Sequence, residues 1–199
     1  MAQLVLNLLG TFQAILDDRP VDAFETDKVR ALLAYLAVES DRPHRRDKLI
    51  GLLWPNYPES SARRSLTQAL YILRKILGDR EAETPFLLVT PRTIQLNPGS
   101  EVELDVDTFL AAVQRGTLED LEAAATAYRG RFLSGLVPDD CSAFDEWVAL
   151  QREALQQRAV TALHRLAVRY EEVGQIRPAL RVLQRQVALD PYWEAGQRS

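Results

Sequence analysis

Side chains suited to nucleic-acid contact gather on one face of the segment ESSARRSLTQALYILRKIL, residues 59–77. Leucines at helical spacing on the other side predict a helix that lies on a core. No carboxylate occurs between Glu59 and Asp79, so the outward charge has one sign. Arginine can bind guanine through two hydrogen bonds, and glutamine can bind adenine in the same way. The candidate DNA-contacting residues are Ser61, Arg63, Arg64, Thr67, Gln68, Tyr71, Arg74 and Lys75.

The place of each residue along this face predicts whether it contacts bases or the sugar-phosphate backbone. Arg64 and Gln68 are four residues apart, so they stand one turn above the other and are the candidates for reading bases. Tyr71 and Lys75 continue the row toward the end of the helix, where contacts to the sugar-phosphate backbone are expected.

A second basic cluster precedes this helix. Between Arg42 and Lys75 there are eight basic and two acidic residues, a local charge of +6 in a chain of net charge −4. Electrostatic binding should therefore be confined to this window. For His44 the alternative is an ordinary loop residue, since its neutral ring donates one hydrogen bond. The candidate phosphate contacts are His44, Arg45, Arg46 and Lys48, with Arg92 and Thr93 at a hairpin tip.

The order of strand and helix signals predicts an α+β domain at the beginning of the chain. Two short strand-like runs surround Gly10, three helical patterns fill residues 26–78, and residues 86–97 have the pattern of a hairpin. Trp54 is expected in the core. Strands, three helices and a hairpin are the element order of a winged helix-turn-helix, whose third helix enters the major groove. This domain is predicted over residues 1–100.

The remaining residues, 101–199, predict an all-α domain. After a polar stretch around Pro98 and Gly99 there is no further strand signal, and helical patterns take over. Helices are expected over residues 105–116, 117–136, 142–174 and 175–191.

Part of this domain has the spacing of one 34-residue tetratricopeptide unit. Gln186 departs from the pattern, which prefers a small residue at that position. Because a helical solenoid needs about three stacked repeats, we expect that the native polypeptide continues or that this form of it is cut short. The matching residues are Leu163, Leu166, Ala167, Tyr170, Gly174, Ala179, Leu183 and Pro191.

Enzymatic chemistry is not predicted. The sequence has no glycine-rich phosphate loop, its two histidines join no metal-ligand cluster, and its single cysteine excludes an internal disulfide. Cys141 is expected to be a small, inert residue near a helix start. The apolar first residues are too short to span a membrane and lack the features of a signal peptide. A cytoplasmic protein without a cofactor, a metal or a membrane partner is therefore expected.

The helical segment from Thr26 to Asp79 resembles the winged-helix domain of the Streptomyces antibiotic regulatory protein family, a branch of the OmpR-like regulators. Residues from about Asp105 onward resemble the bacterial transcriptional activator domain, a tetratricopeptide-like module that follows the winged helix in this family. The shared residues are Lys28-Val29-Arg30-Ala31-Leu32-Leu33, Leu49, Leu53-Trp54-Pro55, Ala62-Arg63, Leu66, Leu73-Arg74-Lys75 and Leu77-Gly78.

The resemblance implies a transcriptional activator that binds double-stranded DNA at direct repeats, as a homodimer of paired protomers, and contacts RNA polymerase. It implies DNA contact from the segment Arg45–Lys48, from the hairpin near Arg92, and from Arg63, Arg64, Thr67, Gln68, Tyr71 and Arg74. The hairpin departs from the family because it lacks a glycine-tyrosine ending, and family members with this opening are often parts of larger proteins with an ATPase. The residues of the loop that would face the polymerase are Pro55, Asn56, Tyr57 and Pro58.

Two other functions remain open. The chain is alternatively a protein–protein interaction module of a larger signalling ATPase, with the winged helix used for docking. A fragment of a regulatory enzyme is a more distant alternative, against which the missing phosphate loop argues. Salt dependence separates DNA binding from docking, because neutralising Z phosphates gives a slope of about −0.9Z in log affinity against log salt.

Overall fold

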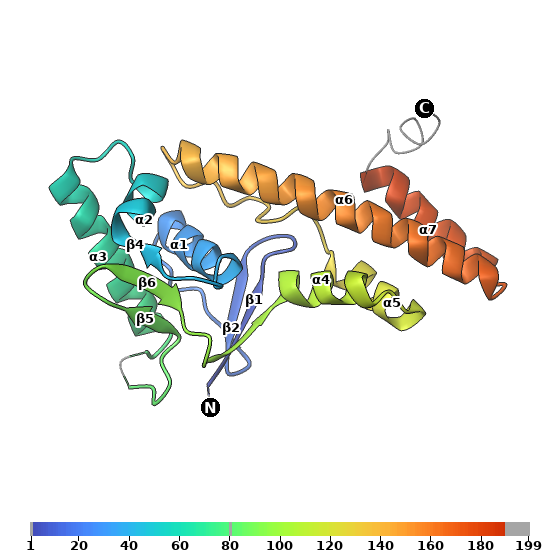
Figure 1. Cartoon of the computed structure of the whole chain (residues 1–199), viewed down its shortest axis with the longest axis horizontal. Coiled ribbons are helices and arrows are strands. Elements are labelled where there is room, and N and C mark those ends of the chain that lie inside the picture. Colours follow the sequence, from blue (N-terminus) through green and yellow to red (C-terminus); the bar gives the residue numbers. More distant parts are fainter. Residues whose placement is uncertain (1, 80, 190–199) are drawn as a thin grey trace.

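The computed structural model describes residues 2–79 and 81–189 and is elongated (Figure 1). One end holds two small sheets and three helices, the other end holds the C-terminal helices, and α6 runs from one end to the other. The strands are β1 (Gln3–Asn7), β2 (Gln13–Leu16), β3 (Arg19–Pro20), β4 (His44–Arg45), β5 (Leu87–Val89), β6 (Thr93–Leu96) and β7 (Glu101–Leu104). The helices are α1 (Asp27–Val38), α2 (Arg46–Leu53), α3 (Glu59–Ile76), α4 (Asp105–Arg115), α5 (Leu118–Ala127), α6 (Ser142–Glu172) and α7 (Ile176–Leu189).

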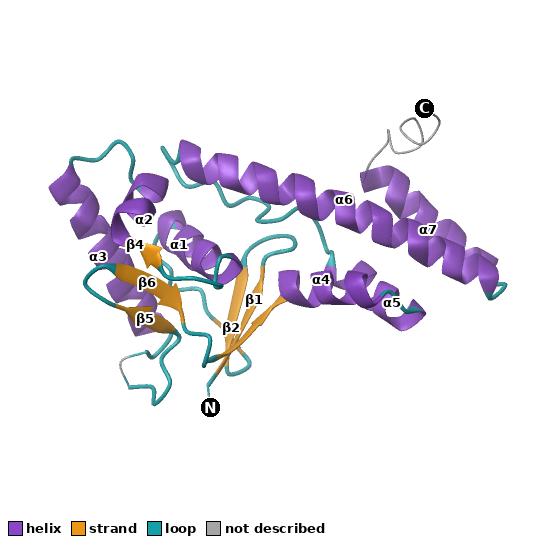
Figure 2. Cartoon of the chain, in the orientation of Figure 1, coloured by secondary structure: helices purple, strands orange, loops and turns teal. Residues whose placement is uncertain are grey.

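Two small sheets accompany α1, α2 and α3 (Figure 2). The first has the strand order β3-β2-β1-β7, and the second has the order β4-β6-β5. The predicted runs around Gly10 form β1 and β2, and the predicted hairpin forms β5 and β6. The sequence prediction of mixed α and β structure is therefore confirmed at this end of the chain.

The core of this end explains the orientation of α3. Its apolar stripe is buried, with Leu66 and Leu73 almost inaccessible, so the opposite side must face solvent. Trp54 follows α2 directly and is 5% exposed, which confirms its predicted place in the core. Gly78 adopts φ +66° just beyond α3, a conformation that costs glycine little and ends the helix.

Strand β7 departs from the sequence expectation. No strand is predicted after residue 100, whereas Glu101–Leu104 pair in parallel with β1. The segment alternates exposed glutamates with apolar residues, but four residues between a polar turn and a helix are too few to stand out. The predicted boundary thus falls directly before a strand that completes the first sheet. The division into domains at residues 1–100 and 101–199 stays a proposal.

A second departure lies in residues 117–136, which the sequence predicts as one helix. The helix α5 ends at Ala127, and the chain then returns to the turn after β1, where the Leu133 backbone N–H donates to the Leu8 carbonyl at 2.8 Å. Leu133 and Gly135 adopt φ +48° and +79°, which a right-handed helix does not allow.

The C-terminal helices form pairs, α4 with α5 and α6 with α7, and arginines tie the pairs together. Arg165 of α6 donates to the Val113 carbonyl near the end of α4 at 2.9 Å. Arg185 of α7 donates to the Ala125 carbonyl near the end of α5 at 2.6 Å. The last carbonyls of a helix lack helical partners, so cationic donors stabilise them.

The tetratricopeptide-like spacing falls mainly on α6 and α7. Gly174, at φ +73°, lies in the turn between these helices. Gln186 is 4% exposed, and its Oε1 atom has no hydrogen-bond partner in the described part of the chain. Pro191 lies outside the described residues. The buried members of the set are Leu163, Leu166, Ala167 and Ala179.

Asp105, the first residue of α4, joins the C-terminal helices to the first sheet. One carboxylate oxygen accepts from the Leu8 backbone N–H at 2.8 Å, and the other accepts from the Leu9 N–H at 2.9 Å. Arg129 donates to the same carboxylate at 2.8 Å. Burial raises the pKa of the Asp105 carboxyl above its usual range, and these three donors act against that shift.

We expect Asp105→Asn to lower the free energy of unfolding by about 1–3 kcal/mol. An amide side chain has only one acceptor oxygen, so one of the two backbone N–H groups would face an NH2 group. Urea denaturation measures the loss. Asp107→Asn is the matched control, because Asp107 lies in the same helical turn and is exposed, whereas Leu8 and Leu9 donate to Asp105. Equal losses in the two variants would contradict the assigned role of Asp105.

Candidate nucleic-acid interface

Helix α3 exposes most of the side chains that the sequence predicts for nucleic-acid contact. Glu59, at its first position, is the only carboxylate within the helix. The exposed members of the predicted set are Arg63, Arg64, Thr67, Gln68, Tyr71 and Lys75, whereas Ser61 and Arg74 are half-buried.

Local contacts order the first turns of this exposed face. Arg63 Nη2 lies 2.6 Å from Glu59 Oε1, and the Thr67 hydroxyl donates to the Arg63 carbonyl at 2.9 Å. Exposed ion pairs of this kind contribute about 0–1 kcal/mol. Arg63 can therefore exchange this carboxylate for a phosphate at little cost.

The structure separates Arg74 from the exposed row. The Asp79 carboxylate, 3% exposed, accepts from the backbone N–H groups of Phe86 at 2.6 Å and Leu87 at 3.0 Å. Burial raises the pKa of Asp79, and the two N–H groups and the nearby Arg74 charge partly offset this. The half-buried Arg74 thus lies near Asp79, where its charge favours the ionised carboxylate. The sequence prediction of a DNA contact there is not supported by this position, since helical spacing does not reveal a carboxylate five residues on.

His44 is also placed differently from the prediction. It is 2% exposed, its Nε2 donates to the Glu39 carbonyl at 2.7 Å, and its ring meets the Tyr35 ring edge-on at 5.2 Å. A buried, hydrogen-bonded ring does not reach a phosphate from this position, so the structure does not support the predicted phosphate contact. The reason is β4, a strand of two residues that pairs His44 with Ile94 and turns its side chain inward.

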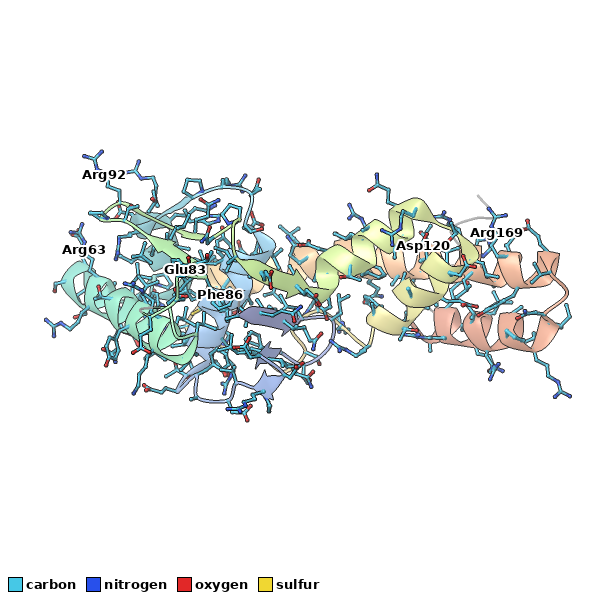
Figure 3. All side chains as sticks on the ribbon, turned by 90° about the horizontal axis from the view of Figure 1, so that it is seen from below. Arg63, Glu83, Phe86, Arg92, Asp120 and Arg169 are labelled. Carbon is cyan, nitrogen blue, oxygen red and sulfur yellow. The ribbon has the colours of Figure 1, made fainter. Side chains whose placement is uncertain are left out.

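A basic groove opens between the start of α2, the first half of α3 and the hairpin turn. Its volume is about 680 Å³, and its lining holds four arginines and one carboxylate. Figure 3 shows Arg63 and Arg92 at the same end of the molecule, far from Asp120 and Arg169. Several cations around one groove favour a ligand with repeated negative charges. The polar lining residues of the basic groove are Arg45, Arg46, Asp47, Arg63, Thr67, Arg92 and Thr93.

Arg46 fixes the hairpin turn to α2. Its backbone N–H donates to the Arg92 carbonyl and its Nε donates to the Thr90 carbonyl, both at 3.1 Å. The Thr90 hydroxyl accepts from the backbone N–H of Thr93 at 2.8 Å, which closes the turn. Thr90 was not among the predicted residues. A threonine directly before Pro91 in a short turn could have indicated this role, because a threonine hydroxyl can accept hydrogen bonds from backbone N–H groups of the turn.

The opposite flank of α3 lines a second hollow, of about 780 Å³. Arg64 and Gln68 lie here, whereas Arg63 and Thr67 line the basic groove. The exposed face of α3 therefore has two flanks of different charge, a division that the sequence does not resolve. The acidic residues around the second hollow are Glu25, Asp27, Asp139 and Asp140.

Two further predicted groups lie outside the basic groove. The loop Pro55–Pro58 is exposed, and Lys28 Nζ lies 4.9 Å from the centroid of the Tyr57 ring. Lys48 is exposed, with its Nζ 5.7 Å from the centroid of the Tyr35 ring. Lys48 therefore belongs to a neighbouring surface and not to the groove lining.

Cys141 occupies the position expected from the sequence. It is the N-cap residue of α6, is 1% exposed, and its Sγ donates to the Leu53 carbonyl at 3.1 Å. Burial raises the pKa of its thiol, which disfavours the reactive thiolate.

In residues 2–79 and 81–189, no group of three or more His, Cys, Asp or Glu side chains could hold a metal ion. No helix in the same part of the chain is long and apolar enough to cross a membrane.

Residues 104–199 match the family described as the bacterial transcriptional activator domain. The chain is 42% identical over 130 residues to the transcriptional regulatory protein EmbR of Mycobacterium tuberculosis, covering 65% of this chain and 31% of EmbR. It is 29% identical over 181 residues to the transcriptional regulatory protein MoaR1 of the same organism, covering 85% of this chain and 57% of MoaR1. The chain thus spans between about a third and just over half of the length of these relatives.

A solved structure of Mycobacterium tuberculosis EmbR in complex with a low affinity phosphopeptide has a similar fold over the matched part. The TM-score is 0.66 at 25% sequence identity, over 96% of this chain and 56% of that chain. Its similarity supports a mixed fold of helices and small sheets for this chain. These relatives are named as transcriptional regulators and not as enzymes, which agrees with the sequence prediction.

Proposed function

We propose that the chain is a sequence-specific DNA-binding transcriptional regulator of the Streptomyces antibiotic regulatory protein family, acting as an activator. The basic groove beside α3 is the observation that carries this proposal, because it concentrates positive charge in a chain of net charge −4. The match to the bacterial transcriptional activator domain and the similarity to EmbR and MoaR1 support a role in transcription.

In the proposed complex, residues 1–100 act as a winged helix-turn-helix. Helix α3 enters the major groove, where Arg64 and Gln68 read base edges. The basic groove holds the sugar-phosphate backbone beside it, and the hairpin of β5 and β6 acts as the wing. Backbone contacts then fix the register in which the two reading residues meet the bases.

The proposed partners follow from the same arrangement. The exposed loop Pro55–Pro58 lies between α2 and α3, next to the reading helix, where it can meet an RNA polymerase bound beside the operator. Two copies bind direct repeats as paired protomers. Residues 101–199 form the tetratricopeptide-like part of the proposed regulator.

We expect Arg92→Ala to weaken binding to all duplexes by a similar factor and to flatten the salt dependence. Removing one phosphate contact should reduce the slope of log affinity against log salt by about one. Titration of fluorescent duplexes of several sequences at several salt concentrations measures both quantities.

Arg169→Ala is the matched control for Arg92→Ala. Arg169 is exposed on α6 at the far end of the molecule (Figure 3), so its removal changes the net charge equally without touching the basic groove. The control should keep the affinity and the slope of the unmodified protein. An equal effect of the two variants would indicate a general charge effect and would count against a backbone contact at Arg92.

A further inference from the structure

We propose that Trp147, on α6, is a positioning residue for DNA binding. Through Glu39 and His44 it holds in place the residues that form two walls of the basic groove. This inference rests on the proposed function, because the positioned residues are the proposed phosphate contacts. It assigns the C-terminal helices a part in DNA affinity although Trp147 itself does not line the groove.

A hydrogen bond and several aromatic contacts fix the orientation of the Trp147 side chain. Its indole N–H donates to Glu39 Oε1 at 3.0 Å, and its ring meets the Tyr35 ring at a centroid distance of 5.0 Å. Phe144 and Phe132 lie against it at 5.4 Å and 5.7 Å. A hydrogen bond to a carboxylate is stronger than one between neutral groups, and the aromatic contacts restrict the ring further. The first half of α6 is thereby attached to the end of α1.

Glu39 and Tyr35 both connect Trp147 to His44. The Glu39 carbonyl accepts from His44 Nε2 at 2.7 Å, while its second carboxylate oxygen accepts from Arg42 at 2.9 Å. The Tyr35 ring, in contact with Trp147, also meets the His44 ring at 5.2 Å. Two independent contacts therefore fix His44 relative to α6, which explains why this histidine is buried just before the basic cluster.

His44 in turn precedes the residues that line the basic groove. In β4, His44 pairs with Ile94 and Arg45 pairs with Thr93 of the hairpin. The next residue, Arg46, donates its backbone N–H to the Arg92 carbonyl at 3.1 Å. A displacement of His44 would therefore move the start of α2 and the hairpin turn together. These are the walls that carry three of the four groove arginines.

Trp147→Phe tests this inference, because it removes the N–H donor and keeps an aromatic ring. We expect affinity for all duplexes to fall about threefold to tenfold, because DNA binding must then reorder the groove walls at a free-energy cost of about one hydrogen bond. The salt slope should shrink by about one, since a displaced arginine no longer neutralises its phosphate. The order of preference among sequences should not change. The backbone amide of Arg46, which donates to the Arg92 carbonyl in the hairpin turn, should exchange its hydrogen faster.

Leu155→Ala is the control for stability. Leu155 is 3% exposed and lies eight residues further along α6 than Trp147, so its truncation should lower stability without changing affinity or slope. Equal losses of affinity in both variants would overturn the inference, as would a Trp147→Phe protein with unchanged affinity, slope and Arg46 exchange. If the unmodified protein binds no DNA, the proposed function fails. Faster Arg46 exchange in Trp147→Phe then still supports the positioning role, and unchanged exchange overturns it.

Discussion

Replacement of Trp54 by alanine is expected to lower the free energy of unfolding by about 3–5 kcal/mol. The indole is 5% exposed at the end of α2 and belongs to the core that also contains the stripe of α3. Its removal leaves a cavity that a close-packed core fills only in part. Because this loss is a large share of the stability of a domain of this size, the variant should bind DNA weakly through unfolding. Urea denaturation followed by circular dichroism measures the loss.

Tyr57→Ala provides the comparison, since Tyr57 is an aromatic residue three positions on but is 43% exposed. Its truncation should change stability by no more than about 0.5 kcal/mol. A Trp54→Ala protein that keeps the unmodified stability and still fails to bind DNA would contradict the core role. It would indicate that the indole acts at the interface instead.

Arg64→Ala is expected to cost about 1–3 kcal/mol in binding to the preferred duplex and to relax the preference for one base pair. The lost interaction is a pair of hydrogen bonds to one base, so non-specific duplexes should be affected much less. Gln68→Ala should act in the same way at a neighbouring base pair, because the two residues are one helical turn apart. Competition binding with single-base operator variants measures the change.

Arg64→Lys separates base reading from charge. Lysine keeps the positive charge but lacks the planar fork of donors, so the salt slope should be retained while discrimination falls. If Arg64→Ala and Gln68→Ala instead weaken all duplexes equally, as is expected of Arg92→Ala, then α3 does not read bases. The acidic flank of the second hollow, which includes Asp139 and Asp140, would then be a reason to look for a different ligand there.

Most of the N-terminal fold could be predicted from the sequence because each element carries a local signal. The leucine stripe of α3 and Gly78 beyond it are examples, and the structure has both. Strand β7 could not be predicted in this way. It pairs with β1, which lies almost a hundred residues earlier in the chain. Parallel pairing between such distant segments leaves no local sequence pattern.

The sequence predicts that the candidate site lies on one face of α3, but it does not predict where each of the candidate side chains lies. The buried His44 donates to the Glu39 carbonyl, and the half-buried Arg74 accepts through its carbonyl from the Asp79 backbone N–H. Neither contact follows from helical spacing. Trp147 shows the same limit, since nothing in the sequence relates it to a carboxylate more than a hundred residues earlier.

Selection of bound sequences from a random duplex pool, with the selected duplexes measured again at two salt concentrations, tests the proposed DNA reading most directly. Enrichment of a short motif, repeated in the same direction about one helical turn apart and bound with strong salt dependence, is the expected result. A pool without enrichment, bound weakly and without salt dependence, would contradict DNA reading by α3. It would favour the alternative in which the chain is a protein–protein interaction module.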